Sequence, residues 1–267
     1  MHEYIGNSPL SRALRQTQLA LAIMLWVGCG TAHADAASGA AASDPTAAVN
    51  YQDFRFRYFD LDRGADKQSF ETEGAYMLSP RLKTTNELRY VNTDSSGKSE
   101  QDFEEFKFKT IFLSKIKPFG INAKLALGAE WLKDLGDFEK GTGTGADKIA
   151  PLVGIGWVPN DENFIVTLVQ YFYSYDTDSA FDQDVRTTNP RLIWIRSLPH
   201  FGGWFKADLK MVIDHEDDEN FDQTLELQLG KMFTPKLGIY GEFFLGDDVL
   251  DSDSYDYAAG VGLRFIY

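Results

Sequence analysis

The last thirteen residues of the chain alternate between two kinds of side chain. One parity is small or polar, and the other is apolar or aromatic, with Tyr255, Tyr257, Ala259, Val261, Leu263, Phe265 and Tyr267. Successive side chains of a β-strand point to opposite faces of a sheet. The segment therefore predicts a strand with one apolar face and one small or polar face.

The same alternation, bounded by turn residues, marks twelve segments along the chain. They lie at about residues 50–59, 68–78, 82–92, 103–114, 120–132, 148–158, 164–175, 189–198, 204–214, 223–233, 237–246 and 255–267. Lengths near ~10 residues fit tilted strands that cross a membrane, and an even number brings both ends of a single-chain barrel to one side. The predicted fold class is therefore all-β, a transmembrane antiparallel up-and-down β-barrel of about 12 strands, with a soluble β-sandwich as the alternative. In the seventh and eighth segments both parities are apolar, so the pattern leaves their orientation open.

The start of the chain has the features of a secretory leader. Two arginines precede an apolar run at 19–27, and the small-x-small sequence at 32–34 fits a cleavage site. Residues 1–34 are therefore predicted to be a cleaved signal peptide, and a lipidated Cys29 is the alternative. The Ala-, Ser- and Gly-rich stretch 35–48 is predicted to be a flexible periplasmic tail, and 49–267 the barrel.

The end of the chain indicates where the barrel is inserted. A terminal aromatic residue on the outward parity is common in barrels of the bacterial outer membrane. Phe265 and Tyr267 resemble the signal that the barrel-assembly machinery of Gram-negative-type cells reads. We therefore expect the outer membrane as the location and this machinery as a partner.

Charge and cysteine content exclude several functions. Loss of the leader changes the net charge from −14 to −15, and an acidic chain is a poor partner for nucleic acid, because phosphate binding needs basic patches. Cys29 is the only cysteine, so the mature chain would form neither disulfides nor thiolate metal sites. We predict no cofactor and no dedicated metal site.

The long connections between the predicted strands are acidic. They hold 24 of the 39 acidic residues that follow the leader, and the densest patch contains Asp214, Glu216, Asp217, Asp218 and Glu219. One interpretation is a solvated surface that divalent cations bridge to neighbouring lipopolysaccharide. The other is an electrostatic funnel that concentrates cations and repels anions at the mouth.

The inward parity of the strands carries equal numbers of basic and acidic residues. The basic set is Arg55, Arg57, Lys83, Arg89, Lys107, Lys109, Lys124, Lys206, Lys210 and Arg264. The acidic set is Asp53, Glu71, Glu73, Glu87, Glu105, Glu130, Asp208, Glu226, Glu242 and Asp256. These charges either line a water-filled channel or pair into a closed network, and we favour a narrow channel with cross-strand pairs.

Aromatic residues near the strand ends predict girdles at the two membrane interfaces. This set is Phe112, Phe119, Trp131, Trp157, Trp204, Phe233 and Tyr267. Tyr171, Tyr173 and Tyr175 share one parity of the seventh segment. If they faced inward they would form a slide for sugars or aromatic compounds, and if outward they would extend the girdle.

Histidine content argues against an enzyme. A hydrolase of this type needs a nucleophile, a base and an orienting group. Only His200 and His215 follow the leader, the first in a predicted turn and the second in the acidic patch without a nearby serine. An outer-membrane hydrolase is therefore the least favoured reading.

Several short motifs between residues 154 and 246 suggest a family. They are GIGWVP at 154–159, NF at 163–164, VQY at 169–171, NPRL at 189–192, LP at 198–199, GGW at 202–204 and LELQLGK at 225–231. Their order resembles the outer-membrane barrels known as transporters or phenol-degradation MetA-type proteins, which implies passage of small molecules. We expect a channel for passive uptake of small cationic or neutral solutes, with aromatic compounds or sugars as candidates. A non-conducting structural or adhesion barrel with acidic loops is the alternative.

Overall fold

The computed structural model describes residues 36–61, 65–118, 121–178, 184–216, 221–246 and 255–267. The predicted leader, 1–34, lies outside these residues. The described chain begins with a helix, α2 (Ala36–Ser43), and continues into the strands. These are β1 (Tyr51–Leu61), β2 (Asp66–Ser79), β3 (Leu82–Thr93), β4 (Glu100–Ile116), β5 (Ala123–Asp134), β6 (Ala146–Asn160), β7 (Asn163–Thr177), β8 (Arg186–Leu198), β9 (Gly203–Asp214), β10 (Phe221–Thr234), β11 (Leu237–Leu245) and β12 (Tyr255–Ile266).

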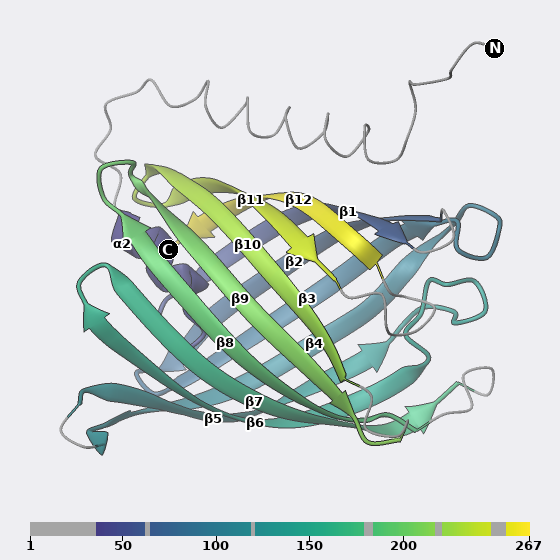
Figure 1. Cartoon of the computed structure of the whole chain (residues 1–267), viewed down its shortest axis with the longest axis horizontal. Coiled ribbons are helices and arrows are strands. Elements are labelled where there is room, and N and C mark those ends of the chain that lie inside the picture. The colour runs from purple at the N-terminus through teal and green to yellow at the C-terminus, as the bar shows by residue number, and fades with distance from the viewer. Residues whose placement is uncertain (1–35, 62–64, 119–120, 179–183, 217–220, 247–254) are drawn as a thin grey trace, which may run out of the picture.

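The strands β1 to β12 form one closed barrel (Figure 1). Strands that follow one another in the chain are neighbours in the sheet, and the pairs are antiparallel. The first and last strands close it, with Tyr51 opposite Ile266 and Arg57 opposite Gly260. Closure leaves no free sheet edge, which is the condition for a sheet to reside in lipid. The predicted fold class, a twelve-stranded antiparallel barrel, is confirmed.

The two ends of the barrel differ. At one end, which we call the terminal end, lie α2 and the C-terminus (Figure 1), together with the two-residue connections 80–81, 161–162 and 235–236. The other, which we call the loop end, has longer connections such as 94–99 and 135–145. Short turns on one side and long loops on the other are typical of outer-membrane barrels.

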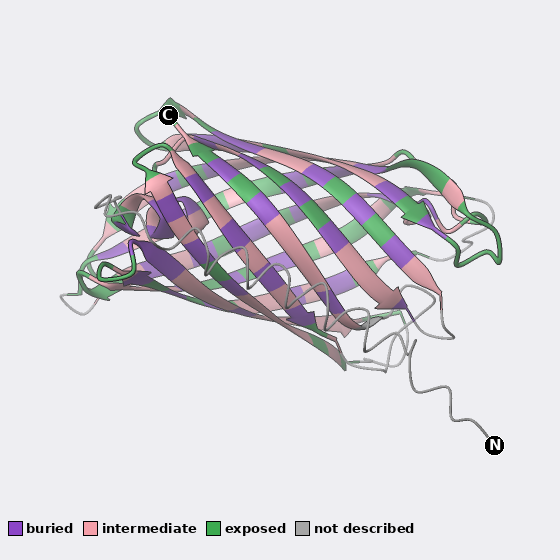
Figure 2. Cartoon of the chain, turned by 90° about the horizontal axis from the view of Figure 1, so that it is seen from above, coloured by how far each residue is buried: buried purple, intermediate pink, exposed green. Residues whose placement is uncertain are grey.

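Side chains alternate between the lumen and the outer surface, and Figure 2 shows this as alternating burial along the strands. On β1, Phe54 and Phe56 are 40% and 47% exposed, whereas Arg55 and Arg57 are each 9% exposed. A continuous exposed aromatic surface is unusual on a soluble protein, but it is what contact with lipid requires. The barrel is therefore apolar outside and charged inside.

A β-bulge in β4 reverses the parity of that strand near the loop end. Arg89 on β3 lies opposite Glu105 and Tyr90 lies opposite Phe103, so Glu104 is the extra residue. A bulge places two residues against one and re-aims a side chain. Both Glu104 and Glu105 are buried and form ion pairs with Arg89 at 3.0 Å.

The stretch before β1 lies inside the barrel and packs against its wall. This differs from the flexible periplasmic tail that the sequence predicted over 35–48. We call residues 36–49 the internal segment. Its helix α2 packs against β8, β9 and β10, and Ala40 is fully buried in a cluster with Ile195 and Trp204. The small residues allow this, because a Cβ on Gly39 would lie 2.3 Å from Cε3 of Trp204. The Ala- and Gly-rich composition thus serves close packing inside the lumen.

None of the helices in the described part of the chain has the length and apolar character needed to cross a membrane.

Candidate functional site

An ion-pair network covers the lumen wall formed by β1 to β4. Its centre is Glu71, whose fully buried carboxylate forms ion pairs with three arginines. Nε of Arg55 lies at 3.2 Å, Nη1 of Arg57 at 2.9 Å and Nε of Arg89 at 3.0 Å from its carboxylate. Arg55 faces Glu71 directly across β1 and β2, as expected for cross-strand pairs. Other members of this network are Lys67, Glu73, Glu87, Glu104, Glu105, Lys107 and Glu242.

A second charged group lies on β8, β9 and β10. Nε of Arg191 donates a hydrogen bond to Oδ1 of Asp208 at 3.2 Å. Nζ of Lys206 lies 2.5 Å from Oε1 of Glu226 and 3.7 Å from Oδ2 of Asp208. Alternating Lys-x-Asp-x-Lys on β9 places these charges on one face, as the period of a strand predicts.

A third group surrounds Arg264 near the terminal end. Nη2 of Arg264 lies 2.7 Å from Oδ2 of Asp53, and the Tyr240 hydroxyl donates to the same carboxylate at 2.9 Å. The guanidinium lies 5.2, 5.1 and 5.0 Å from the ring centres of Tyr51, Trp204 and Tyr240. Cation–π contacts of this kind add to the ion pair and fix the plane of the guanidinium.

Trp204 belongs to this interior group, so its expected place in an interfacial girdle is wrong. Its side chain is fully buried, and Nε1 donates a hydrogen bond to Oε1 of Gln228 at 2.7 Å. It shares the parity of Lys206 and Asp208, and Gly230 opposite it leaves room for the indole. The position of Trp204 near a strand end had suggested the membrane interface. Whether a side chain faces the lumen or the lipid depends instead on its odd or even position along the strand.

The internal segment is held on one side by β10 and β12. Nη1 of Arg264 donates to the carbonyl oxygen of Gly39 at 3.1 Å and to Oγ of Ser43 at 2.5 Å. Oγ of Ser43 donates in turn to Oε1 of Gln228 at 3.1 Å. Because the side chains of Arg264 and Gln228 are also bound to Asp53 and Trp204, the helix is tied to a rigid part of the wall.

On the other side, the internal segment is held by β3, β5 and β6. Nζ of Lys83 donates to the carbonyl oxygen of Ala47 at 3.1 Å, and Nζ of Lys124 lies 4.0 Å from Oδ2 of Asp44. The segment therefore crosses the lumen from β8–β12 to β3–β6 and narrows the passage near the terminal end.

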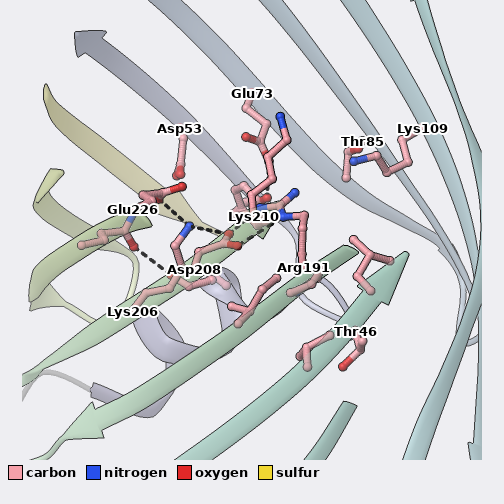
Figure 3. Close-up of a pocket in the computed structure, with 18 of the residues that line it drawn as sticks. Thr46, Asp53, Glu73, Thr85, Lys109, Arg191, Lys206, Asp208, Lys210 and Glu226 are labelled. Carbon is pink, nitrogen blue, oxygen red and sulfur yellow. Dashed lines mark hydrogen bonds and ion pairs between the residues drawn. The ribbon is translucent and has the colours of Figure 1, made fainter. Parts of the chain in front are cut away.

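A cavity of about 340 Å³ lies between the internal segment and the charged groups. Figure 3 shows Arg191, Lys206, Asp208, Lys210 and Glu226 gathered around this space. The lining also has an apolar patch on β4 to β7, with Ile111, Ala126, Leu152 and Leu168. The interior thus offers a small solute both charged groups and an apolar wall.

The orientation of β7 and β8, open from the sequence, is settled by burial. Tyr171, Tyr173 and Tyr175 are 39%, 40% and 52% exposed, whereas Leu168 and Gln170 are buried. These tyrosines therefore lie on the outer surface and form no slide in the lumen. β8 has its two isoleucines toward the lumen and its tryptophan outward.

Most of the predicted lumen residues lie on the inner face. They are Asp53, Arg55, Arg57, Glu71, Glu73, Lys83, Glu87, Arg89, Glu105, Lys107, Lys109, Lys124, Glu130, Lys206, Asp208, Lys210, Glu226, Glu242 and Arg264. The side chain of Asp256 lies outside the described residues. Whether the inner set lines an open pore stays a prediction.

Several inner residues were missed by the sequence analysis, among them Glu104, Arg191 and Lys67. Lys67 pairs with Glu104 and lies just before the predicted segment 68–78. Glu104 was missed because the bulge in β4 is not visible from alternation. Arg191 was missed because both faces of β8 are apolar. Treating Trp194 as lipid-facing would have placed Arg191 inside, since the two differ in parity.

The predicted girdle and the acidic patch are only partly within the described residues. Phe112, Trp131 and Tyr267 are exposed on the outer surface, and Phe119 lies outside the described residues.

Of the acidic patch, Asp214 and Glu216 are described, and Nε of Arg186 lies 3.0 Å from Oε1 of Glu216. Asp217, Asp218 and Glu219 lie outside the described residues. In another connection of the loop end, 135–145, the Lys140 ammonium bonds Asp137 at 2.8 Å and holds the pKa of that carboxyl below its usual value.

Across the described chain, no group of three or more His, Cys, Asp and Glu side chains is arranged to hold a metal ion.

Comparison with known proteins identifies similar folds but no related sequence. No protein-family profile and no curated protein sequence matches the chain, so the resemblance to MetA-type proteins stays a prediction. Among solved structures, the NanC porin is similar with a TM-score of 0.60 and 10% identity, over 81% of this chain and 98% of that one. The COG4313 outer membrane channel from Pseudomonas putida F1 has a TM-score of 0.60 and 9% identity, over 82% and 96%. The KdgM porin has a TM-score of 0.53 and 8% identity, over 81% and 99%.

The chain therefore has the fold of a closed twelve-stranded antiparallel barrel, and these porins and the COG4313 outer membrane channel are similar to it in fold.

Proposed function

We propose that this protein is an outer-membrane channel through which small solutes pass passively. The observation that carries the proposal is the lumen itself, which is charged, encloses a cavity of about 340 Å³ and is surrounded by an apolar outer surface. The similar solved structures, which are described as porins and as an outer membrane channel, support the same class of function.

The acidic loop end supports a preference for cationic or neutral solutes at the outer mouth, with sugars or aromatic compounds as candidates. A charged entrance raises the local concentration of counter-ions and lowers that of co-ions. The same carboxylates would bind divalent cations that bridge to lipopolysaccharide.

At the other end of the barrel, the barrel-assembly machinery would recognise the terminal Phe265 and Tyr267.

A second candidate, a non-conducting barrel that presents acidic loops, is favoured by one specific feature. The internal segment crosses the lumen and is tied to both walls by Arg264 and Lys83. If it stays in place, conductance should be small or absent.

Single-channel recording of the refolded mature protein in a planar bilayer under a salt gradient tests both. Discrete openings with a cation-directed reversal potential would support the channel and the acidic entrance. Openings that favour anions would support the channel and contradict the acidic entrance as the selective element. A correctly folded barrel without openings would contradict the channel.

A further inference from the structure

The cavity beside the internal segment has an excess of positive charge in its lining. Nine arginine and lysine side chains face it, against five aspartates and glutamates. Most of the positive groups are paired with carboxylates, for example Lys109 with Glu130 at 3.0 Å and Lys206 with Glu226 at 2.5 Å. Lys210 differs, because among the described residues its ammonium takes part in no hydrogen bond or ion pair.

The neighbours of Lys210 leave its charge poorly compensated. It lies opposite Arg191 in the sheet, and the carboxylate of Asp208 is already committed to Arg191 and Lys206. Arg191 and Lys107 repel the ammonium, while Asp208 and Asp222 attract it. Lys210 is partly exposed to the cavity, so an anion bound beside it would meet an ammonium that has no carboxylate of its own within the described part of the chain, and Arg191 would add to the attraction.

Part of the lining of the same cavity, on β4 to β7, is apolar and adjoins the charged group, since Leu168 pairs with Arg191 across β7 and β8. Ile111, Leu152 and Leu168 are 4%, 6% and 7% exposed and form one cluster with Ala126. All four face the cavity. An inorganic ion would leave this wall unused, whereas an organic anion would bury its hydrocarbon part there.

We propose that this cavity binds a small organic carboxylate. Its carboxylate group would lie at Lys210, beside Arg191, and its apolar body would lie against Ile111, Leu152 and Leu168. The volume of about 340 Å³ is within the range of small-molecule pockets. The proposal rests on the proposed function in one respect, because the ligand reaches the cavity through the lumen. The acidic entrance would slow the entry of an anion but would not change its equilibrium affinity for the cavity.

Benzoate is a suitable probe, with two comparators that each lack one recognised feature. Benzamide keeps the ring without the charge, and acetate keeps the charge without the ring. Binding to the refolded mature protein in detergent micelles is measured by isothermal titration. We expect benzoate to bind more tightly than either comparator.

Two variants separate the charged wall from the apolar wall. Lys210→Met should weaken benzoate binding about tenfold, as loss of a charge-assisted contact implies, and should leave benzamide binding unchanged. Leu152→Ala should weaken benzoate binding and leave acetate binding unchanged.

The control is Lys231→Met, because Lys231 lies over the Phe201 ring at 5.0 Å and is not part of the cavity lining. It removes the same charge and should leave benzoate binding as in the wild type. Heat-dependent gel mobility verifies that each variant is folded. Equal binding of benzoate and benzamide, or wild-type benzoate binding by folded Lys210→Met, would overturn the proposal.

Bilayer recording separates this proposal from the channel function. A folded barrel that shows no channel openings but still binds benzoate through Lys210 would support the proposed carboxylate site and refute the channel function. A conducting barrel to which benzoate does not bind would refute the site and leave the channel standing.

Discussion

Replacing Glu71 by glutamine should destabilise the barrel strongly, although the change is isosteric. The side chain is fully buried and lies within 3.2 Å of Arg55, Arg57 and Arg89. Glutamine would keep an acceptor for the Ser69 hydroxyl, which donates to Glu71 at 3.0 Å. The negative charge at the centre of three guanidinium groups would be lost, and one acceptor oxygen would become an NH2 donor that faces arginine donors.

The size of the loss in unfolding free energy depends on which carboxylates each arginine still contacts in Glu71→Gln. Removing one partner of a buried ion pair costs about 3–5 kcal/mol when the other charge is left alone. Arg55 still reaches Glu87 at 2.6 Å, and Arg57 still reaches Glu242 at 2.8 Å. We therefore expect the lower end of that range, about 3 kcal/mol, or roughly a hundredfold in the folding equilibrium.

Urea-induced unfolding in lipid vesicles, followed by tryptophan fluorescence, measures this free energy. The control is Glu162→Gln, because Glu162 pairs with Arg196 at 3.4 Å and both side chains are about half exposed. That pair should contribute less than about 1 kcal/mol. Equal stabilities for Glu71→Gln and the wild type, or equal losses in the two variants, would refute the view that the buried network holds the β1–β4 wall together.

Three further predictions concern the internal segment and the C-terminus. Gly39→Leu should expel α2, because even a Cβ there would lie 2.3 Å from Trp204; we expect larger single-channel conductance, and unchanged conductance would show that the helix does not narrow the passage. In Thr46→Cys with Gly156→Cys, the two Cβ positions lie 3.3 Å apart, close to the ~3.8 Å of a disulfide. The sole cysteine of the chain lies in the predicted leader, so oxidation should give a reducible shift in gel mobility, and its absence would contradict the placement of the segment. Deleting Tyr267 should lower the yield of heat-modifiable barrel in the outer membrane, and an unchanged yield would exclude it as an assembly signal.

Much of the barrel could be predicted because its lumen is polar where its outside is apolar. On β1 this contrast is complete, since Phe54 and Phe56 alternate with Arg55 and Arg57. On β7 and β8 the contrast disappears, because the inner residues Val166 and the two isoleucines of β8 belong to the apolar cluster that contains Ala40 of α2. A lumen wall that contacts a folded segment is apolar on both faces, and periodicity cannot orient it.

The site was harder to predict because its decisive features are not local. The bulge that turns Glu104 inward depends on the register between β3 and β4. The place of the internal segment depends on Trp204 and Arg264, which lie far along the chain. An Ala-rich stretch has the composition of a disordered tail and also that of a helix in a narrow space, and only its distant neighbours distinguish the two.

The contacts of the internal segment also have a consequence for the order of folding. The carbonyl of Gly39 is bound by Arg264, 225 positions later and on β12, the strand that closes the barrel against β1. Contacts of such long sequence separation form late, so α2 has no complete binding place until β12 has paired. Because the segment directly precedes β1, the strand that closes against β12, it can enter while that seam is still open. Protection of α2 from protease during refolding should therefore report seam closure, and a chain truncated before β12 should leave α2 accessible.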